Sequence, residues 1–129
     1  MNVPTDRKYS ETHEWFLVDD NNVVTLGITQ FAADELTDIT YVELPEEGAT
    51  VSAGAPIGEV ESVKATSEVF TAVGGTVVEV NTALTDHPEL INDDAFDEGW
   101  LVKIKADSLH GLETLMSAKA YKTFAAAAH

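Results

Sequence analysis

Apolar and polar residues alternate along much of the chain up to residue 105, which is the pattern of half-buried β-strands. Gly, Pro, Asn and Asp residues interrupt the alternating runs at short intervals, as they do in the turns between strands. A chain patterned in this way is mainly β-structure with short connections. The runs predict strands at residues 9–18, 23–28, 39–44, 54–61, 65–70, 74–80 and 100–105.

The first two predicted strands are joined by residues 19–22, which read Asp-Asp-Asn-Asn. Asp and Asn tolerate the left-handed backbone angles that tight turns require. We therefore predict that residues 9–18 and 23–28 form a β-hairpin. A short helix is predicted at residues 30–36, since Thr29 stands where its hydroxyl can cap the first turn. Phe31, Ala32 and Leu36 would share one side of this helix.

The spacing of apolar residues changes from strand-like to helical after residue 105. A first helix is expected here with Asp107 or Ser108 as its cap, and Ser117 can cap a last helix on which Tyr121 and Phe124 share a face. The apolar residues that define the first of these helices are Leu109, Leu112, Leu115 and Met116.

Two similar β-turn-β halves lie on either side of a central predicted hairpin. Residues 48–54 precede this hairpin and residues 74–80 follow it, with matching Gly and Val positions. This repeat predicts a small sandwich of two antiparallel sheets. At 129 residues the chain is expected to be one domain spanning residues 1–129. Its β core would cover about residues 9–105, and a C-terminal helical segment about residues 107–126.

The composition excludes several classes of function. The formal net charge is −16, which opposes binding to nucleic acid and to an anionic membrane surface. The chain has no cysteine, so disulfides, thiolate nucleophiles and cysteine-based metal sites are excluded. No apolar stretch is long enough to span a bilayer, and the N-terminus shows no secretory signal. We expect a cytoplasmic protein, or one of the mitochondrial matrix if this is a processed chain.

One lysine stands apart from the other basic residues. Lys64 is the only Lys or Arg between Lys8 and Lys103, and it falls midway between the predicted strands at residues 54–61 and 65–70. The ordinary interpretation is a solvated turn lysine. The flanking sequence favours a functional one, because a hairpin between two matching β halves presents its tip residue at one end of the sandwich.

This arrangement resembles the lipoyl/biotinyl carrier domain, a barrel-sandwich hybrid in which a tip lysine is acylated by a cofactor. Biotin carriers usually place Met beside that lysine, whereas Val63 and Ala65 flank Lys64 here. The turn resembles the lipoylation site of the glycine cleavage system H protein family, and the likeness extends over nearly the whole chain. The segments that carry it, in the family's order, are Tyr9-Ser10 with His13-Glu14-Trp15, Gly27-Ile28-Thr29, Glu43-Leu44-Pro45, Glu61-Ser62-Val63-Lys64-Ala65, Val80-Asn81, Pro88-Glu89-Leu90-Ile91-Asn92 and Gly99-Trp100.

The resemblance implies roles for particular residues. Lys64 would carry lipoate through an amide, and a lipoate-attaching enzyme would recognise the neighbouring Glu61, Ser62, Val63 and Ala65. The family docks its loaded arm in a cleft, and the positions that match the polar lining of this cleft are Thr12, Glu14 and Glu68. A departure from the family is Phe31, where its members often carry His.

The resemblance also implies the function. The chain would not be an enzyme but a lipoyl carrier, passing an aminomethyl group on lipoyl-Lys64 from the glycine decarboxylase (P protein) to the aminomethyltransferase (T protein). Dihydrolipoyl dehydrogenase (L protein) would then reoxidise the cofactor. A monomer is expected for a shuttle that visits several enzymes. The histidines are scattered without the spacing of metal ligands, so no metal is expected. His13 is interpreted as a structural residue packed beside Trp15.

Three alternatives stay open beside this interpretation. One alternative is a carrier that relays lipoyl groups to other complexes, a second role for the same kind of protein. The chain would be a plain interaction module if Lys64 stays unmodified. An enzyme using the carboxylates Glu59, Glu61 and Glu68 would need a deep pocket, which a small sandwich rarely offers.

Overall fold

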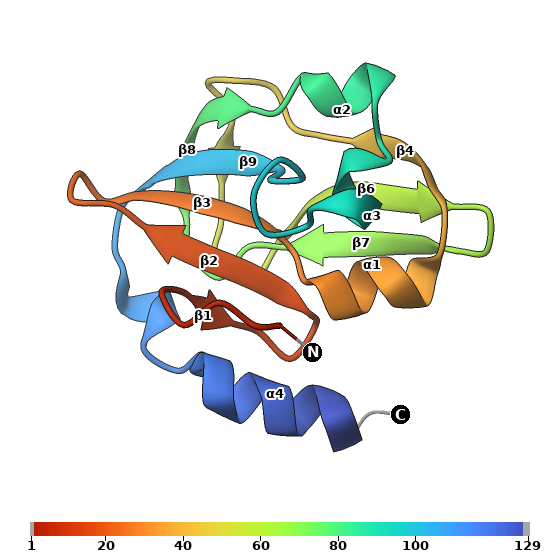
Figure 1. Cartoon of the computed structure of the whole chain (residues 1–129). Helices are drawn as coiled ribbons and strands as arrows, with labels where there is room; N and C mark the ends of the chain where they lie inside the picture. The colour runs from red at the N-terminus through yellow and green to blue at the C-terminus, as the bar shows by residue number, and fades with distance from the viewer. Residues whose placement is uncertain (1, 128–129) are drawn as a thin grey trace.

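The protein is built from two antiparallel β-sheets with short helices around them, as a computed structural model describes for residues 2–127 (Figure 1). The six-stranded sheet has the order β1-β2-β3-β9-β8-β5, and the three-stranded sheet has the order β4-β6-β7. The mainly β fold with two antiparallel sheets is therefore confirmed. The strands of the larger sheet are β1 (Lys8–Tyr9), β2 (Glu14–Val18), β3 (Val23–Ile28), β9 (Val102–Ala106), β8 (Gly75–Val80) and β5 (Thr50–Val51).

The smaller sheet carries the predicted central hairpin. Its strands are β4 (Ile39–Glu43), β6 (Pro56–Ser62) and β7 (Thr66–Phe70). The register of β6 and β7 pairs Glu61 with Thr66 and Val60 with Ser67. The chain therefore reverses through residues 63–65, with Lys64 in the turn. Figure 1 shows the turn that joins β6 and β7 at the right-hand side of the picture.

Most helices are short and lie at the ends of the sheets. Within residues 2–127 no helix is long and apolar enough to cross a membrane. Thr29 caps α1 as predicted, because its Oγ1 accepts a hydrogen bond from the N–H of Ala32 at 3.2 Å. The helices are α1 (Gln30–Leu36), α2 (Ala83–Asp86), α3 (Leu90–Asp93), a 3₁₀ turn η1 (His110–Leu112) and α4 (Ala118–Ala127).

The main core lies between the two sheets, and a second apolar cluster lies under α4. Strand β9 shows the alternation clearly, since Val102, Ile104 and Ala106 are buried while the lysines between them face outward. The second cluster joins the N-terminal part of the chain to α4, which runs beside β1 in Figure 1. Its buried members are Val3, Tyr9, Trp15, Ala118, Tyr121 and Ala125.

The predicted strand at residues 9–18 is wrong in one respect, because the chain breaks into β1 and β2. Residues 10–13 form a turn in which His13 adopts a φ of 69°, a left-handed angle that a strand residue does not have. The turn lets β1 fold back onto β2, so that Tyr9 pairs with Trp15. Apolar and polar residues alternate in the same way before and after such a turn, so the alternation does not reveal the turn.

The first predicted C-terminal helix is also wrong, since only the 3₁₀ turn η1 forms there. Met116, which falls on the helical stripe, instead pairs with Tyr9 through two backbone hydrogen bonds of 2.8 and 2.9 Å. Its backbone is committed to β1 and cannot continue a helix. The last helix is confirmed as α4, with Ser117 Oγ accepting a hydrogen bond from Ala120 N at 3.2 Å.

Candidate functional site

The turn that carries Lys64 is held in shape by Ser62. The Ser62 hydroxyl accepts hydrogen bonds from the N–H of Lys64 at 3.1 Å and of Ala65 at 3.0 Å, and it donates to the Ala65 carbonyl at 3.2 Å. The serine therefore stabilises the turn through hydrogen bonds between its side chain and the backbone. Val63 N also donates to Asp38 O at 3.1 Å, which ties the turn to the segment before β4. The lysine backbone is fixed while its side chain is exposed.

The Lys64 side chain reaches across to α1. Its Nζ donates a hydrogen bond to the backbone carbonyl of Glu35 at 3.0 Å. Glu35 lies in the last turn of α1, where carbonyl groups have no partner within the helix and carry partial negative charge. The last turn of α1 contains no basic residue of its own, so Lys64 supplies the cation from the neighbouring sheet.

An open groove is lined in part by Glu35, the residue that Lys64 contacts. It has a volume of about 300 Å³ and combines apolar side chains of α1 with polar side chains from the turn before β2 and from β7. Glu35 belongs both to the groove lining and to the Lys64 contact, so the lysine amine lies against a residue that lines the groove. Its lining residues are Thr12, His13, Phe31, Ala32, Glu35, Leu36 and Ser67.

Two of the three predicted cleft residues meet beside this groove. Thr12 lines it, and the Thr12 hydroxyl donates a short hydrogen bond to Oε1 of Glu14. The Glu14 side chain is buried and also accepts from the Ser10 hydroxyl and from Phe70 N at 3.1 Å. Burial raises the pKa of Glu14, and these hydrogen bonds oppose that shift. Glu14 therefore lies behind Thr12 and holds the Thr12 hydroxyl in place.

The third predicted cleft residue, Glu68, is not brought into the groove lining. It lies exposed on β7, and its neighbour Ser67 lines the groove instead. Successive side chains of a strand point to opposite faces of the sheet, so Ser67 and Glu68 cannot both face α1. Val69 confirms the direction of these side chains. It follows Ser67 by two positions, so it lies on the same face of the strand as Ser67 and opposite to Glu68, and it is buried in the core.

His13 was expected to be a structural residue packed beside Trp15. The structure instead packs its ring against Phe31, Tyr121 and Phe124, at centroid distances of 4.9, 5.7 and 5.8 Å. The His13 side chain is half-buried, and this burial lowers its pKa while the nearby charge of Glu35 opposes the shift. Sequence reasoning gave no groove role to His13, because its partners are distant in the chain.

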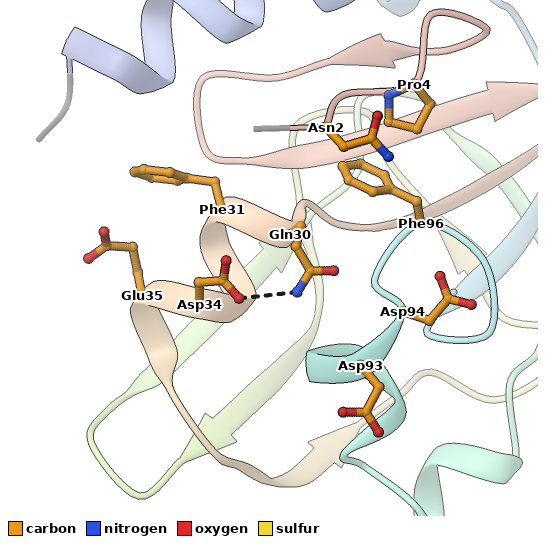
Figure 2. A pocket seen from close by; sticks show the side chains of 9 residues that line it. All are labelled: Asn2, Pro4, Gln30, Phe31, Asp34, Glu35, Asp93, Asp94 and Phe96. Carbon is orange, nitrogen blue, oxygen red and sulfur yellow. Dashed lines mark hydrogen bonds between the residues drawn. The ribbon is translucent and has the colours of Figure 1, made fainter.

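A larger hollow of about 550 Å³ lies on the other flank of α1 (Figure 2). Gln30 sits at its centre and donates hydrogen bonds to Asp34 Oδ1 at 3.1 Å and to the Asn92 carbonyl at 2.7 Å. Asp93 and Asp94 form its opposite wall, and Phe31 and Glu35 point away from them in the figure. Within residues 2–127 no group of three or more His, Asp or Glu residues is arranged to hold a metal ion.

Residues of the groove that sequence reasoning missed come from α1 and β7. Phe31, Ala32 and Leu36 were predicted to share one side of a helix, and that side forms the apolar wall. The helical spacing was therefore a signal for them, although it did not show what the helix faces. Ser67 had no such signal.

Comparisons with known proteins point to one family. Residues 7–128 match the family model described as glycine cleavage H-protein. The glycine cleavage system H protein of Geobacillus kaustophilus is 47% identical over 122 residues, covering 95% of each chain. That of Marinobacter nauticus is 46% identical over 125 residues, covering 97% of this chain and 96% of the relative. A crystal structure of a glycine cleavage system H protein from Mycobacterium marinum superposes with a TM-score of 0.87 at 38% identity, covering 94% of this chain and 97% of the other.

Proposed function

Since this chain belongs to the glycine cleavage H-protein family, whose members are carriers in the glycine cleavage system, we propose that Lys64 carries a covalently attached lipoyl group. The observation that carries the proposal is the position of Lys64 itself. The lysine is exposed in a turn fixed by Ser62, and its amine contacts Glu35, a residue that lines the groove.

The groove fits such an arm. An acylated lysine is a long aliphatic chain with a polar end, and the groove joins an apolar wall of Phe31, Ala32 and Leu36 to the polar side chains of Thr12 and Ser67. The Lys64 amine lies at the Glu35 carbonyl, so an arm attached there begins at the apolar wall.

The lipoyl group would supply the chemistry, taking up an aminomethyl group from the glycine decarboxylase, giving it to the aminomethyltransferase, and being reoxidised by dihydrolipoyl dehydrogenase. The chain's own residues bind and shield the arm. Thr12 presents a hydroxyl oxygen to the groove, and the buried carboxyl of Glu14 behind it orients that hydroxyl. A cationic amine held there would gain from the negative charge of Glu14 in surroundings of low dielectric.

The lipoate-attaching enzyme would recognise the tip of the β6–β7 hairpin. Val63, beside the lysine, is 70% exposed and is therefore available for contact with a partner. Glu61 lies in β6 opposite Thr66, and Ser62 and Ala65 complete the hydrogen-bonded turn. These residues would make a rigid substrate surface for acyl transfer.

The partner enzymes would approach a strongly acidic protein. The formal net charge of −16 favours partners with basic faces and increases the rate of encounter with them at low salt. The relatives from Geobacillus, Marinobacter and Acinetobacter are bacterial proteins, which supports a cytoplasmic location for this chain. A monomer suits a carrier that visits each enzyme in turn.

The test is the intact mass of the protein produced in cells that contain a lipoate-attaching enzyme and are supplied with lipoate. We expect the parent to gain the mass of one lipoyl amide and Lys64→Ala to gain nothing. Lys122→Ala, which removes an exposed lysine of α4, is the matched control and should be lipoylated like the parent. An unmodified parent beside a control carrier lipoylated in the same cells would overturn the proposal and leave an interaction module.

A further inference from the structure

A chain of hydroxyl groups links α4 to the groove. Tyr121 Oη lies 2.7 Å from His13 Nδ1 and 2.8 Å from Thr29 Oγ1. Thr29 and Tyr121 are both fully buried, and Thr29 N also donates to the His13 carbonyl at 2.9 Å. The last helix, the cap of the first helix and the turn before β2 therefore share one polar network.

The number of protons available in this network fixes the direction of its hydrogen bonds. Tyr121 has one hydroxyl proton and can donate it either to Thr29 or to His13. If it donated to Thr29, the buried Thr29 hydroxyl would have no acceptor for its own proton among residues 2–127, since its remaining contact is the Ala32 N–H, a donor. A buried donor without an acceptor is costly. Thr29 therefore donates to Tyr121, and Tyr121 donates to His13 Nδ1.

This direction assigns the tautomer of His13. Nδ1 accepts a hydrogen bond, so the neutral ring carries its proton on Nε2. The burial that disfavours the charged form of His13 agrees with a neutral ring. The ring of His13, whose backbone has a left-handed φ of 69°, packs against both Phe31 and Tyr121, where this contact forms.

The other ring nitrogen is accessible. His13 Nε2 has no hydrogen-bond partner among residues 2–127, whereas every buried side-chain nitrogen or oxygen of those residues has one. Nε2 is therefore not buried, and His13 lines the groove. The groove thus contains an acceptor, the Thr12 hydroxyl backed by Glu14, and a donor from the adjacent residue.

We infer that Tyr121 of α4 positions His13 as an Nε2–H donor in the groove, and that this donor binds a sulfur of the arm on Lys64. The inference rests on the proposed function, because it assumes the lipoyl arm. Thr12 and His13 are neighbours, so the groove offers an acceptor and a donor side by side, which suits an arm end that carries an amine next to a sulfur. In this scheme His13 contacts the arm, and Tyr121 is a positioning residue that acts through His13.

The first test is made on the full-length chain without any arm, by nitrogen-15 NMR of the histidine rings at neutral pH. We expect His13 to show a protonated Nε2 and an unprotonated Nδ1 in the parent. Tyr121→Phe keeps the ring packing and removes the hydroxyl, and it should lose this single tautomer. Tyr41→Phe, which alters an exposed tyrosine of β4, should leave the His13 signals unchanged. A proton on Nδ1 in the parent would overturn the positioning role.

The second test compares arms on Lys64. Octanoyl has the length of lipoyl without its sulfurs, so the octanoylated chain is the matched control for the reduced lipoylated chain. We expect the His13 Nε2 signal to shift in the reduced lipoylated chain and not in the octanoylated one, and Tyr121→Phe to weaken that shift. The same shift with both arms, or with neither, would overturn the contact with sulfur. Failure of lipoylation itself appears separately in the intact mass.

Discussion

The amine of Lys64 and the backbone carbonyl of Glu35 are joined by a hydrogen bond of 3.0 Å, although the two residues lie in different elements. The bond connects the tip of the β6–β7 hairpin to the C-terminal turn of α1. It places the positive charge of the lysine on the negative end of a helix that has no basic residue in its last turn. The unmodified lysine therefore rests against Glu35, which also lines the groove.

Removing the charge of Lys64 should loosen the last turn of α1. We expect Lys64→Gln to lower the free energy of unfolding by less than about 1 kcal/mol, because an exposed cation at a helix C-terminus contributes little. Hydrogen exchange of the α1 amides should become faster. Lys64→Arg keeps the charge and is the control, with exchange in α1 close to that of the parent. Equal exchange in all three proteins would show that the contact contributes nothing in solution.

The buried carboxyl of Glu14 should make stability depend on pH. Its pKa is raised by burial, so the native state keeps the proton to higher pH than the unfolded chain does. The free energy of unfolding should therefore fall as the pH rises from about 4.3, the ordinary glutamate value, through the raised pKa of Glu14. Glu14→Gln cannot ionise and should lack this fall.

Urea unfolding at a series of pH values measures the effect of Glu14. Gln can keep the contacts, because its oxygen can accept from Phe70 N and its amide can donate to the hydroxyls of Ser10 and Thr12. Glu47→Gln, in an exposed turn, is the control for loss of a carboxylate. Parallel curves for the parent and Glu14→Gln would contradict the raised pKa.

Ser62 should matter more for acylation than for stability. Ser62→Ala removes the acceptor of two backbone N–H groups at an exposed turn, and we expect a loss of about 1 kcal/mol in the free energy of unfolding. The rate of lipoylation of Lys64 should fall several-fold, because the enzyme would meet a disordered tip. Ser62→Asn offers another side-chain acceptor and should recover most of the rate, measured by intact mass against time. No recovery with Asn would point to direct recognition of the serine.

Gly27 and Trp15 form a cross-strand pair in which only glycine fits. The two residues are opposite one another in β3 and β2, and a Cβ on Gly27 would lie 2.8 Å from Cζ2 of the Trp15 ring. Gly27→Ala should therefore lower the free energy of unfolding by about 1–3 kcal/mol through overpacking. The combination with Trp15→Phe should cost less than the sum of the two changes, since the smaller ring leaves room. Additive losses would show that the ring is not the obstacle.

Part of the site was predictable because it is local in sequence. Ser62, Lys64 and Ala65 make their turn among themselves, so the reversal of the chain at Lys64 follows from the two flanking β runs. The caps at Thr29 and Ser117 are local in the same way, each accepting from an N–H three residues ahead. Hydrogen bonds between residues this close in sequence depend on particular residue types at fixed spacings, so the sequence predicts them.

The sequence by itself determined the mainly β sandwich and the lysine at the hairpin tip, because strand alternation and turn residues act over a few positions. Only the tertiary structure decided the groove, which gathers residues 12–13, α1 and Ser67 from separate parts of the chain. It also decided the break at His13, whose ring partner Tyr121 lies 108 positions away. A contact between residues so far apart in sequence depends on how whole helices and strands pack, so local sequence patterns do not predict it.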